Sequence, residues 1–153
     1  MLKRLAVLLL LVCGSTAAWA DAAKDCGEKS GDVGIAACSE YIRLYPPHAS
    51  VFHNRGVGYK NKGQYDRAIA DFNEAIRLDP KHASAFHNRG IAYRAKGDND
   101  RAIADYNEAI RLNPKEARAV HNRGIAYRAK GDNARANADF DQAIKLDPKL
   151  QRP

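Results

Sequence analysis

The sequence predicts an all-α protein, built as a solenoid of antiparallel helix pairs. The main observation is a regular repeat: the run His-Asn-Arg-Gly, followed by two residues and a tyrosine, starts at His53, His87 and His121, which are evenly spaced. Glycines, alanines and prolines between these runs keep the same period without an insertion. Such a period is typical of repeats that stack on one another, because one helix pair cannot bury enough apolar surface alone.

Residues 1–20 have the composition of a secretory signal. Two basic residues, Lys3 and Arg4, precede an apolar run, and Ala18-Trp19-Ala20 ends the segment. This order predicts cleavage after Ala20 and a mature protein in the periplasm. The apolar run of about eight residues is much shorter than the roughly 20 that a membrane-spanning helix needs. We therefore expect no stable membrane span after cleavage.

The cysteines predict one disulfide. Cleavage of the signal removes two basic residues and Cys13, which lowers the formal net charge from +7 to +5 and leaves Cys26 and Cys38. An even number of cysteines in an exported chain indicates a disulfide, because compartments outside the cytoplasm are oxidising. The alternatives are two reduced thiols packed as small apolar residues, and a zinc site, for which His48 is the nearest imidazole.

Residues 21–48 form an irregular first unit. The apolar residues of 35–44 recur at helical spacing, and the segment stops at Pro46, which lies one full period before Pro80. This helix therefore takes the place of the second helix in a repeat. Only a short stub of first helix precedes it, and a Cys26–Cys38 bond would pin that stub across the helix. We interpret the unit as an atypical amino-terminal cap, as solenoid ends usually are.

Three full repeats follow, at residues 49–82, 83–116 and 117–150, with a tail at 151–153. In each repeat, each of the two helices carries three residues at i, i+4 and i+7. This spacing places the three residues on one face of their helix. Gly63 separates the helices of the first repeat, where a residue able to adopt positive φ is wanted, and Pro80 ends that repeat. The spaced residues are Phe52, Gly56, Tyr59, Ala68, Phe72 and Ala75; Phe86, Gly90, Tyr93, Ala102, Tyr106 and Ala109; Val120, Gly124, Tyr127, Ala136, Phe140 and Ala143.

This pattern resembles the tetratricopeptide repeat family, which has a large residue, Gly, Tyr, Gly, Ala, an aromatic residue, Ala and Pro at these places. The resemblance covers residues 49–150 fully and 31–48 loosely. It implies a right-handed superhelix of helix pairs, with a concave wall built from the first helix of each pair. One departure is shared by the three repeats, because Arg55, Arg89 and Arg123 stand where the family usually has leucine.

Each of these arginines is followed at one constant spacing by an aspartate, at Asp71, Asp105 and Asp139. The aspartates fall on the second helix of each pair. Because the two helices of a pair are antiparallel, we predict an arginine–aspartate pair that bridges them in every repeat. The alternative is an arginine free to bind a ligand. Exposed ion pairs contribute about 1 kcal/mol or less, so this interpretation expects replacement of Arg89 by leucine to preserve folding.

The resemblance also implies a binding groove along the concave wall. It suits other proteins or extended peptides with acidic and apolar side chains. The predicted contact residues are His53, Lys60, His87, Asn88, Ile91, Arg94, Arg118, His121, Asn122, Ile125 and Arg128. Chaperone adaptors of the family clamp a terminal carboxylate with Lys, Asn, Asn, Lys and Arg. Those places hold His53, Val57, Asn88, Arg118 and Asn122 here. Only Asn88 matches, so we expect a general groove and not that clamp.

Other classes of function find less support. The sequence contains no phosphate-binding glycine loop, nucleophile elbow or HExxH motif, so we predict no enzymatic activity and no cofactor. The histidine column suggests metal binding as an alternative, but neighbouring helices about 8–10 Å apart keep three imidazoles from one ion. We therefore predict no metal site. A sequence pI of 9.4 suggests nucleic-acid binding as another alternative, against which stand the signal segment and the near invariance of the groove residues.

The last repeat differs at one informative position. Ile69 and Ile103 follow the first alanine of the second helix, and Asn137 takes that place in the third repeat. A polar residue suits a face that no further repeat covers. No solvating helix follows in the sequence, so we expect the last helix pair to be frayed, to self-associate or to be covered by another protein.

Overall fold

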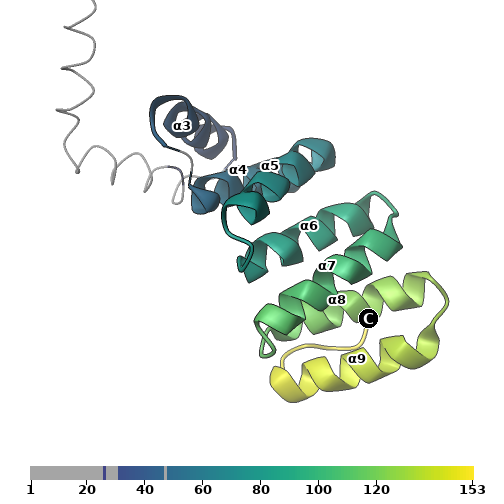
Figure 1. Ribbon diagram of the computed structural model, residues 1–153. Coiled ribbons are helices and arrows are strands. Elements are labelled where there is room, and N and C mark those ends of the chain that lie inside the picture. The colour runs from purple at the N-terminus through teal and green to yellow at the C-terminus, as the bar shows by residue number, and fades with distance from the viewer. Residues whose placement is uncertain (1–25, 27–30, 47) are drawn as a thin grey trace, which may run out of the picture.

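The computed structural model describes residues 26, 31–46 and 48–153, which form a stack of helices without a strand (Figure 1). The all-α prediction is therefore confirmed. The helices are α3 (Gly31–Leu44), α4 (Ala49–Asn61), α5 (Tyr65–Leu78), α6 (Ala83–Ala95), α7 (Asn99–Leu112), α8 (Ala117–Ala129) and α9 (Asn133–Leu146).

The helices pack as antiparallel pairs in two layers. Each first helix (α4, α6, α8) contacts its own second helix (α5, α7, α9) and the second helix before it. The first helices also contact one another in succession, whereas no two of the described second helices do. The first helices therefore form the inner layer of a curved stack. Helix α3 packs on α4 as α5 packs on α6, so it lies in the place of a second helix.

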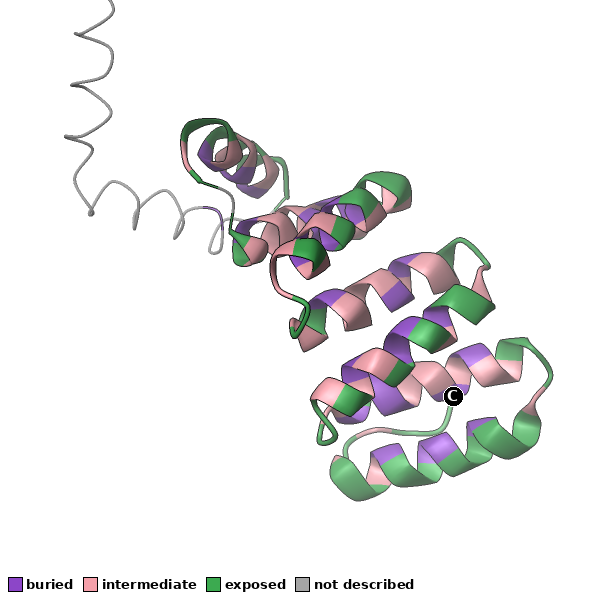
Figure 2. Ribbon diagram, viewed as in Figure 1, coloured by how far each residue is buried: buried purple, intermediate pink, exposed green. Residues whose placement is uncertain are grey.

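The core lies where small residues of one helix meet aromatic rings of the other. A Cβ atom added at Gly90 would lie 2.7 Å from Cε1 of Tyr106, and Gly56 and Gly124 meet Phe72 and Phe140 in the same way. These three rings are fully buried. Figure 2 shows the buried positions on the helix faces that meet neighbouring helices. The apolar stripes predicted from the spacing thus supply much of the core, whereas Phe52, Phe86, Tyr93 and Tyr127 are half-buried.

The turns inside the pairs use glycine as predicted. Gly63, Gly97 and Gly131 have φ values of 72°, 82° and 81°, a region that favours glycine because it lacks a Cβ atom. In the second repeat, the Asp98 side chain accepts a hydrogen bond from the backbone N–H of Arg101 and caps α7.

The predicted arginine–aspartate pairs are present in all three repeats. Arg89 Nε and Nη2 donate to Asp105 Oδ2 and Oδ1 at 2.8 and 2.7 Å. The other pairs have the same two-point geometry and join Arg55 to Asp71 and Arg123 to Asp139.

The expectation that these are exposed ion pairs is wrong. In the three pairs the aspartate side chains are only 7–8% exposed and the arginine side chains 19%. Burial raises the pKa of the Asp105 carboxyl, and the hydrogen bonds from Arg89 oppose that rise. Removing Arg89 alone would leave a carboxylate buried without its cation, so the small cost expected for an exposed pair does not apply.

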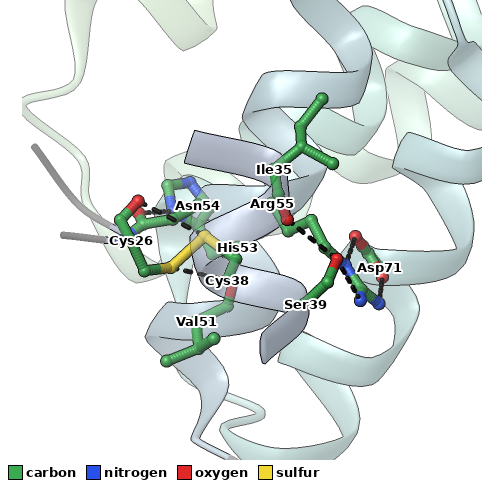
Figure 3. Close-up of a disulfide and its surroundings, with 9 residues drawn as sticks. All are labelled: Cys26, Ile35, Cys38, Ser39, Val51, His53, Asn54, Arg55 and Asp71. Carbon is green, nitrogen blue, oxygen red and sulfur yellow. Dashed lines mark hydrogen bonds and ion pairs between the residues drawn. A yellow bond between two sulfur atoms is a disulfide. The ribbon is translucent and has the colours of Figure 1, made fainter. Parts of the chain in front are cut away.

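Each arginine also reaches the repeat before its own. Arg89 Nη1 donates to Asn73 Oδ1 on α5 at 2.7 Å, so one guanidinium joins α5, α6 and α7. Sequence reasoning missed this contact, although its signal was present as a polar residue recurring at a constant spacing before each arginine. The equivalent contacts join Arg123 to Asn107 and Arg55 to Ser39 (Figure 3).

A row of lysine–aspartate pairs links the turns of successive units. The pairs are Lys62–Asp32, Lys96–Asp66 and Lys130–Asp100. They repeat with the same period, and the aspartates are largely exposed, so each pair contributes little stability. In the third repeat Ala134 occupies the place of the aspartate, and Asn137 is exposed. The outer face of α9 therefore differs from those of α5 and α7.

The amino-terminal unit has its own small core. Cys26 and Cys38 are buried together with Tyr41 and Val51, and their sulfur atoms are bonded in the structure (Figure 3). The arrangement is compatible with the predicted disulfide, whose presence in the exported protein stays a prediction. The predicted signal and most of the predicted stub lie outside the described residues. No helix of the described part is long and apolar enough to cross a membrane.

Candidate functional site

The predicted contact residues lie on the inner layer of first helices, in rows that follow the repeat. We call this surface the inner face. From the start of each helix onward, its rows are Ser50, Ser84 and Arg118, which are exposed; His53, His87 and His121; Val57, Ile91 and Ile125; and Lys60, Arg94 and Arg128, all half-buried. The asparagines Asn54, Asn88 and Asn122 lie beside the histidines.

Hydrogen bonds between histidines and asparagines join neighbouring repeats. Asn88 Nδ2 lies 3.2 Å from His53 Nε2 and donates to Ser84 O at 2.9 Å, while Asn88 Oδ1 accepts from Lys60 Nζ at 2.7 Å. These partners fix the orientation of the Asn88 amide, because its nitrogen only donates and its oxygen only accepts. The next link is Asn122 Nδ2 at 2.9 Å from His87 Nε2. We call these links the His–Asn ladder.

The ladder determines the protonation of its histidines. Because an amide nitrogen donates, Nε2 of His53 is the acceptor, and its Nδ1, 3.3 Å from Asn54 Oδ1, carries the proton. Burial is the main cause that lowers the pKa of His53 and of His87 to about 4, and nearby cationic groups add to the effect. Both rings therefore stay neutral at pH 7.

The ladder residues hold the stack together. His53, His87, Asn88 and Asn122 already use polar atoms between repeats, a role that the sequence did not reveal. Their predicted contact with a peptide stays a prediction. A metal would have to displace the asparagines from the Nε2 atoms, and the described residues contain no cluster of three or more His, Cys, Asp or Glu side chains suited to a metal ion.

The middle repeat holds two polar atoms that lack hydrogen bonds. Arg94 Nε and the Tyr106 hydroxyl are buried without a partner among the described residues. Burial raises the pKa of Tyr106 to about 12, and the adjacent Arg94 opposes the rise. The first and third repeats have phenylalanine at this place, so among the three repeats the buried hydroxyl on the second helix is peculiar to the middle one.

The remaining cations keep donors available. Arg118 is exposed, and the Arg128 guanidinium lies over the Phe140 ring, 4.6 Å from its centroid. Lys60, Arg94 and Arg128 line one side of the aliphatic row, and Arg118 lies beyond the histidine row on the other side. This combination is chemically suited to hold apolar side chains and to donate hydrogen bonds to carboxylate or carbonyl oxygens.

The third repeat has a ligand from the chain itself. His121 Nε2 lies 2.9 Å from Gln151 O, and Arg128 Nη1 donates to Pro153 O at 2.6 Å. The residues after α9 turn back toward α8 in Figure 1. Two predicted contact residues thus bind main-chain oxygen atoms.

A family model described as tetratricopeptide repeat matches residues 54–117 and 87–150. No curated protein matches the chain significantly. Solved structures do. The crystal structure of MamA is 26% identical, with a TM-score of 0.72, over 77% of this chain and 69% of that one.

Two further similar structures are domains of one protein. The first TPR of Spaghetti (RPAP3), bound to HSP90 peptide SRMEEVD, is 29% identical, with a TM-score of 0.66, over 68% of this chain and 82% of that one. The second TPR of the same protein, bound to the same peptide, is 30% identical, with a TM-score of 0.64, over 65% and 93%.

Proposed function

Because this chain belongs to the tetratricopeptide repeat family, we propose that it is an exported scaffold without catalytic activity, whose inner face binds extended segments of other proteins. The observation that carries the proposal is the pairing of two rows on the inner face. Each first helix presents an aliphatic residue and, three positions later, a cation: Val57 and Lys60, Ile91 and Arg94, Ile125 and Arg128. Side chains at this spacing are neighbours on one helical face.

The cations favour acidic partners. The peptide SRMEEVD, to which two similar domains are bound, has three acidic residues and one basic residue. This chain has only Asn88 in common with the family's carboxylate clamp, and Asn88 is held by His53, Ser84 and Lys60. We therefore propose recognition through the aliphatic and cationic rows, not through a copy of the clamp.

Export to the periplasm is the second part of the proposal, and the composition of residues 1–20 supports it. Fractionation of cells, followed by mass spectrometry of the mature protein, tests it. We expect the protein in the periplasmic fraction, with Asp21 as its first residue. A chain that keeps Met1 and stays with the cytoplasm would contradict export but not binding by the inner face.

The test of binding compares two doubly substituted chains. Arg94→Gln with Arg118→Gln removes two cations from the inner face without touching the His–Asn ladder. Arg77→Gln with Arg111→Gln is the matched control, because it removes two exposed cations from the second helices, where each bonds a glutamate three residues earlier. Both changes lower the net charge by two.

Each mature protein is used for crosslinking capture from an envelope extract, and circular dichroism verifies that it is folded. We expect the inner-face variant to lose partners that the unsubstituted chain and the control retain. If both variants lose the same partners, net charge alone explains the capture. If neither loses any, the inner face is not the binding surface.

A further inference from the structure

The carboxyl-terminal tail lies in a site made by the last two helices. Gln151 O and Pro153 O, two residues apart, meet His121 Nε2 and Arg128 Nη1 on α8. Between them, the Arg152 guanidinium pairs with Asp141 on α9. Three consecutive residues of the tail therefore each make a polar contact, and the contacts alternate between backbone and side chain.

Two of these contacts occupy places that the next repeat fills elsewhere in the stack. His87 Nε2 meets Asn122 of the following first helix, whereas His121 Nε2 meets Gln151 O. Asp141 lies one full period after Asn107, which accepts from Arg123 of the following repeat. Arg152 gives Asp141 a guanidinium in the same way.

The tail also reverses the hydrogen-bond role of the histidine. Nε2 of His53 and of His87 accepts from an asparagine amide. A backbone carbonyl only accepts, so Nε2 of His121 must carry a proton to bond Gln151 O. Docking of the tail therefore requires the Nε2–H tautomer of His121.

We propose that residues 151–153 are an internal ligand of the inner face at the third repeat, where they cover His121 and Arg128 until a partner displaces them. The site takes a segment with a basic side chain between two main-chain oxygen atoms, those of Gln151 and Pro153. Asp141 supplies this preference, and Ser39, Asn73 and Asn107 occupy its place in the earlier units. The third repeat thus selects a basic residue, whereas the rest of the inner face is lined by cations. The displacement step rests on the proposed function, but the docking of the tail does not.

The docking is tested by NMR on the mature, uniformly ¹⁵N-labelled chain. In the unsubstituted protein we expect backbone order parameters near 0.85 at Gln151 and Arg152, and the Nε2–H tautomer at His121. Asp141→Asn should lower the order parameters below about 0.6 and change the imidazole ¹⁵N shifts of His121. Glu74→Gln is the matched control, because it removes a carboxylate from α5 that pairs only with Arg77 among the described contacts.

The proposal is overturned if the tail has order parameters below about 0.6 in the unsubstituted chain, or if Asp141→Asn changes them no more than Glu74→Gln does. A dilution series distinguishes a tail bound in its own chain from one bound to a second copy. Order that is unchanged on dilution supports the internal ligand. Order that is lost on dilution assigns the site to a second copy and overturns it.

Removal of residues 151–153 tests displacement. If the tail is docked for about nine-tenths of the time, only about one-tenth of the molecules have a free site, and its removal should strengthen binding about tenfold for a captured partner that needs the third repeat. The partner used is one whose binding to the chain without residues 151–153 is weakened by Arg128→Gln. If removal of these residues leaves the affinity for that partner unchanged, the displacement step is overturned. A mobile tail with normal capture would refute only this inference, whereas a docked tail with no inner-face capture would refute only the proposed function.

Discussion

Replacing Arg89 by leucine, the residue usual in the family, removes the cation from a carboxylate that is almost fully buried. Asp105 accepts two hydrogen bonds from Arg89, and its side chain is 8% exposed. The same substitution removes the bond to Asn73 and leaves that amide at the surface. The Arg89 guanidinium also lies over the Phe86 ring, 5.5 Å from its centroid, and leucine keeps only part of that contact.

The expected loss of stability is about 2 to 4 kcal/mol, somewhat below the 3 to 5 kcal/mol typical for breaking a fully buried pair, because Arg89 is 19% exposed. Most of this loss comes from the unpaired charge of Asp105. Adding Asp105→Asn removes that charge and keeps the shape of the side chain. The double variant should therefore regain about 1 to 2 kcal/mol relative to Arg89→Leu alone.

Urea denaturation followed by circular dichroism measures both variants against the unsubstituted mature chain. The whole curve is compared, because a repeat protein can depart from two-state unfolding. A loss below about 1 kcal/mol for Arg89→Leu would mean that the pair behaves as an exposed one. A double variant less stable than the single one would mean that the cost does not arise from the buried charge.

Three further predictions concern pH, packing and the disulfide. Lowering the pH from 7 to about 5 should reduce the free energy of unfolding by about 1 to 2 kcal/mol for each of His53 and His87. The reason is that their pKa is lowered in the folded protein, so the unfolded chain binds more protons below about pH 6.5. An equal Tm at both pH values would refute this. Gly90→Ala should cost about 1 to 3 kcal/mol in urea denaturation, because its Cβ meets a buried ring, and an unchanged midpoint would contradict that packing. Alkylation of unreduced mature protein should leave its mass unchanged if Cys26 and Cys38 are bonded, whereas two added alkyl groups would exclude the bond.

Much of the core could be predicted because both partners of each contact repeat in the sequence. Gly90 and Tyr106 belong to columns that occur three times, so helical spacing alone brings them together. The same is true of Arg89 and Asp105, which keep one constant spacing on antiparallel helices. The spacing does not reveal how deeply the two side chains are buried. The burial of Asp105 depends on how closely the helices around it pack, and the period leaves that packing unspecified.

The inner face was harder to predict for the same reason. His53 and Asn88 belong to different repeats, and each lies on the polar side of its own helix. A polar side of a helix is either open to solvent or covered by the next repeat, and the two cases have the same sequence pattern. The tail is harder still, because Gln151 and Arg152 belong to no repeated column.

The polar links have a consequence for how the stack unfolds. The stability of a solenoid is approximately the sum of a term for each repeat and a term for each interface between neighbours. Arg89 contributes to both, since it bonds Asp105 within its own repeat and Asn73 in the preceding one. The Asn88–His53 bond crosses the same interface on the inner face. Loss of Arg89 should therefore weaken the second repeat and its junction with the first together, so that the transition broadens as well as shifts. A partner that binds across α4 and α6 needs the inner-face rows of these two helices to stay aligned. Its binding would therefore stabilise the interface between the first and second repeats, which loss of Arg89 weakens.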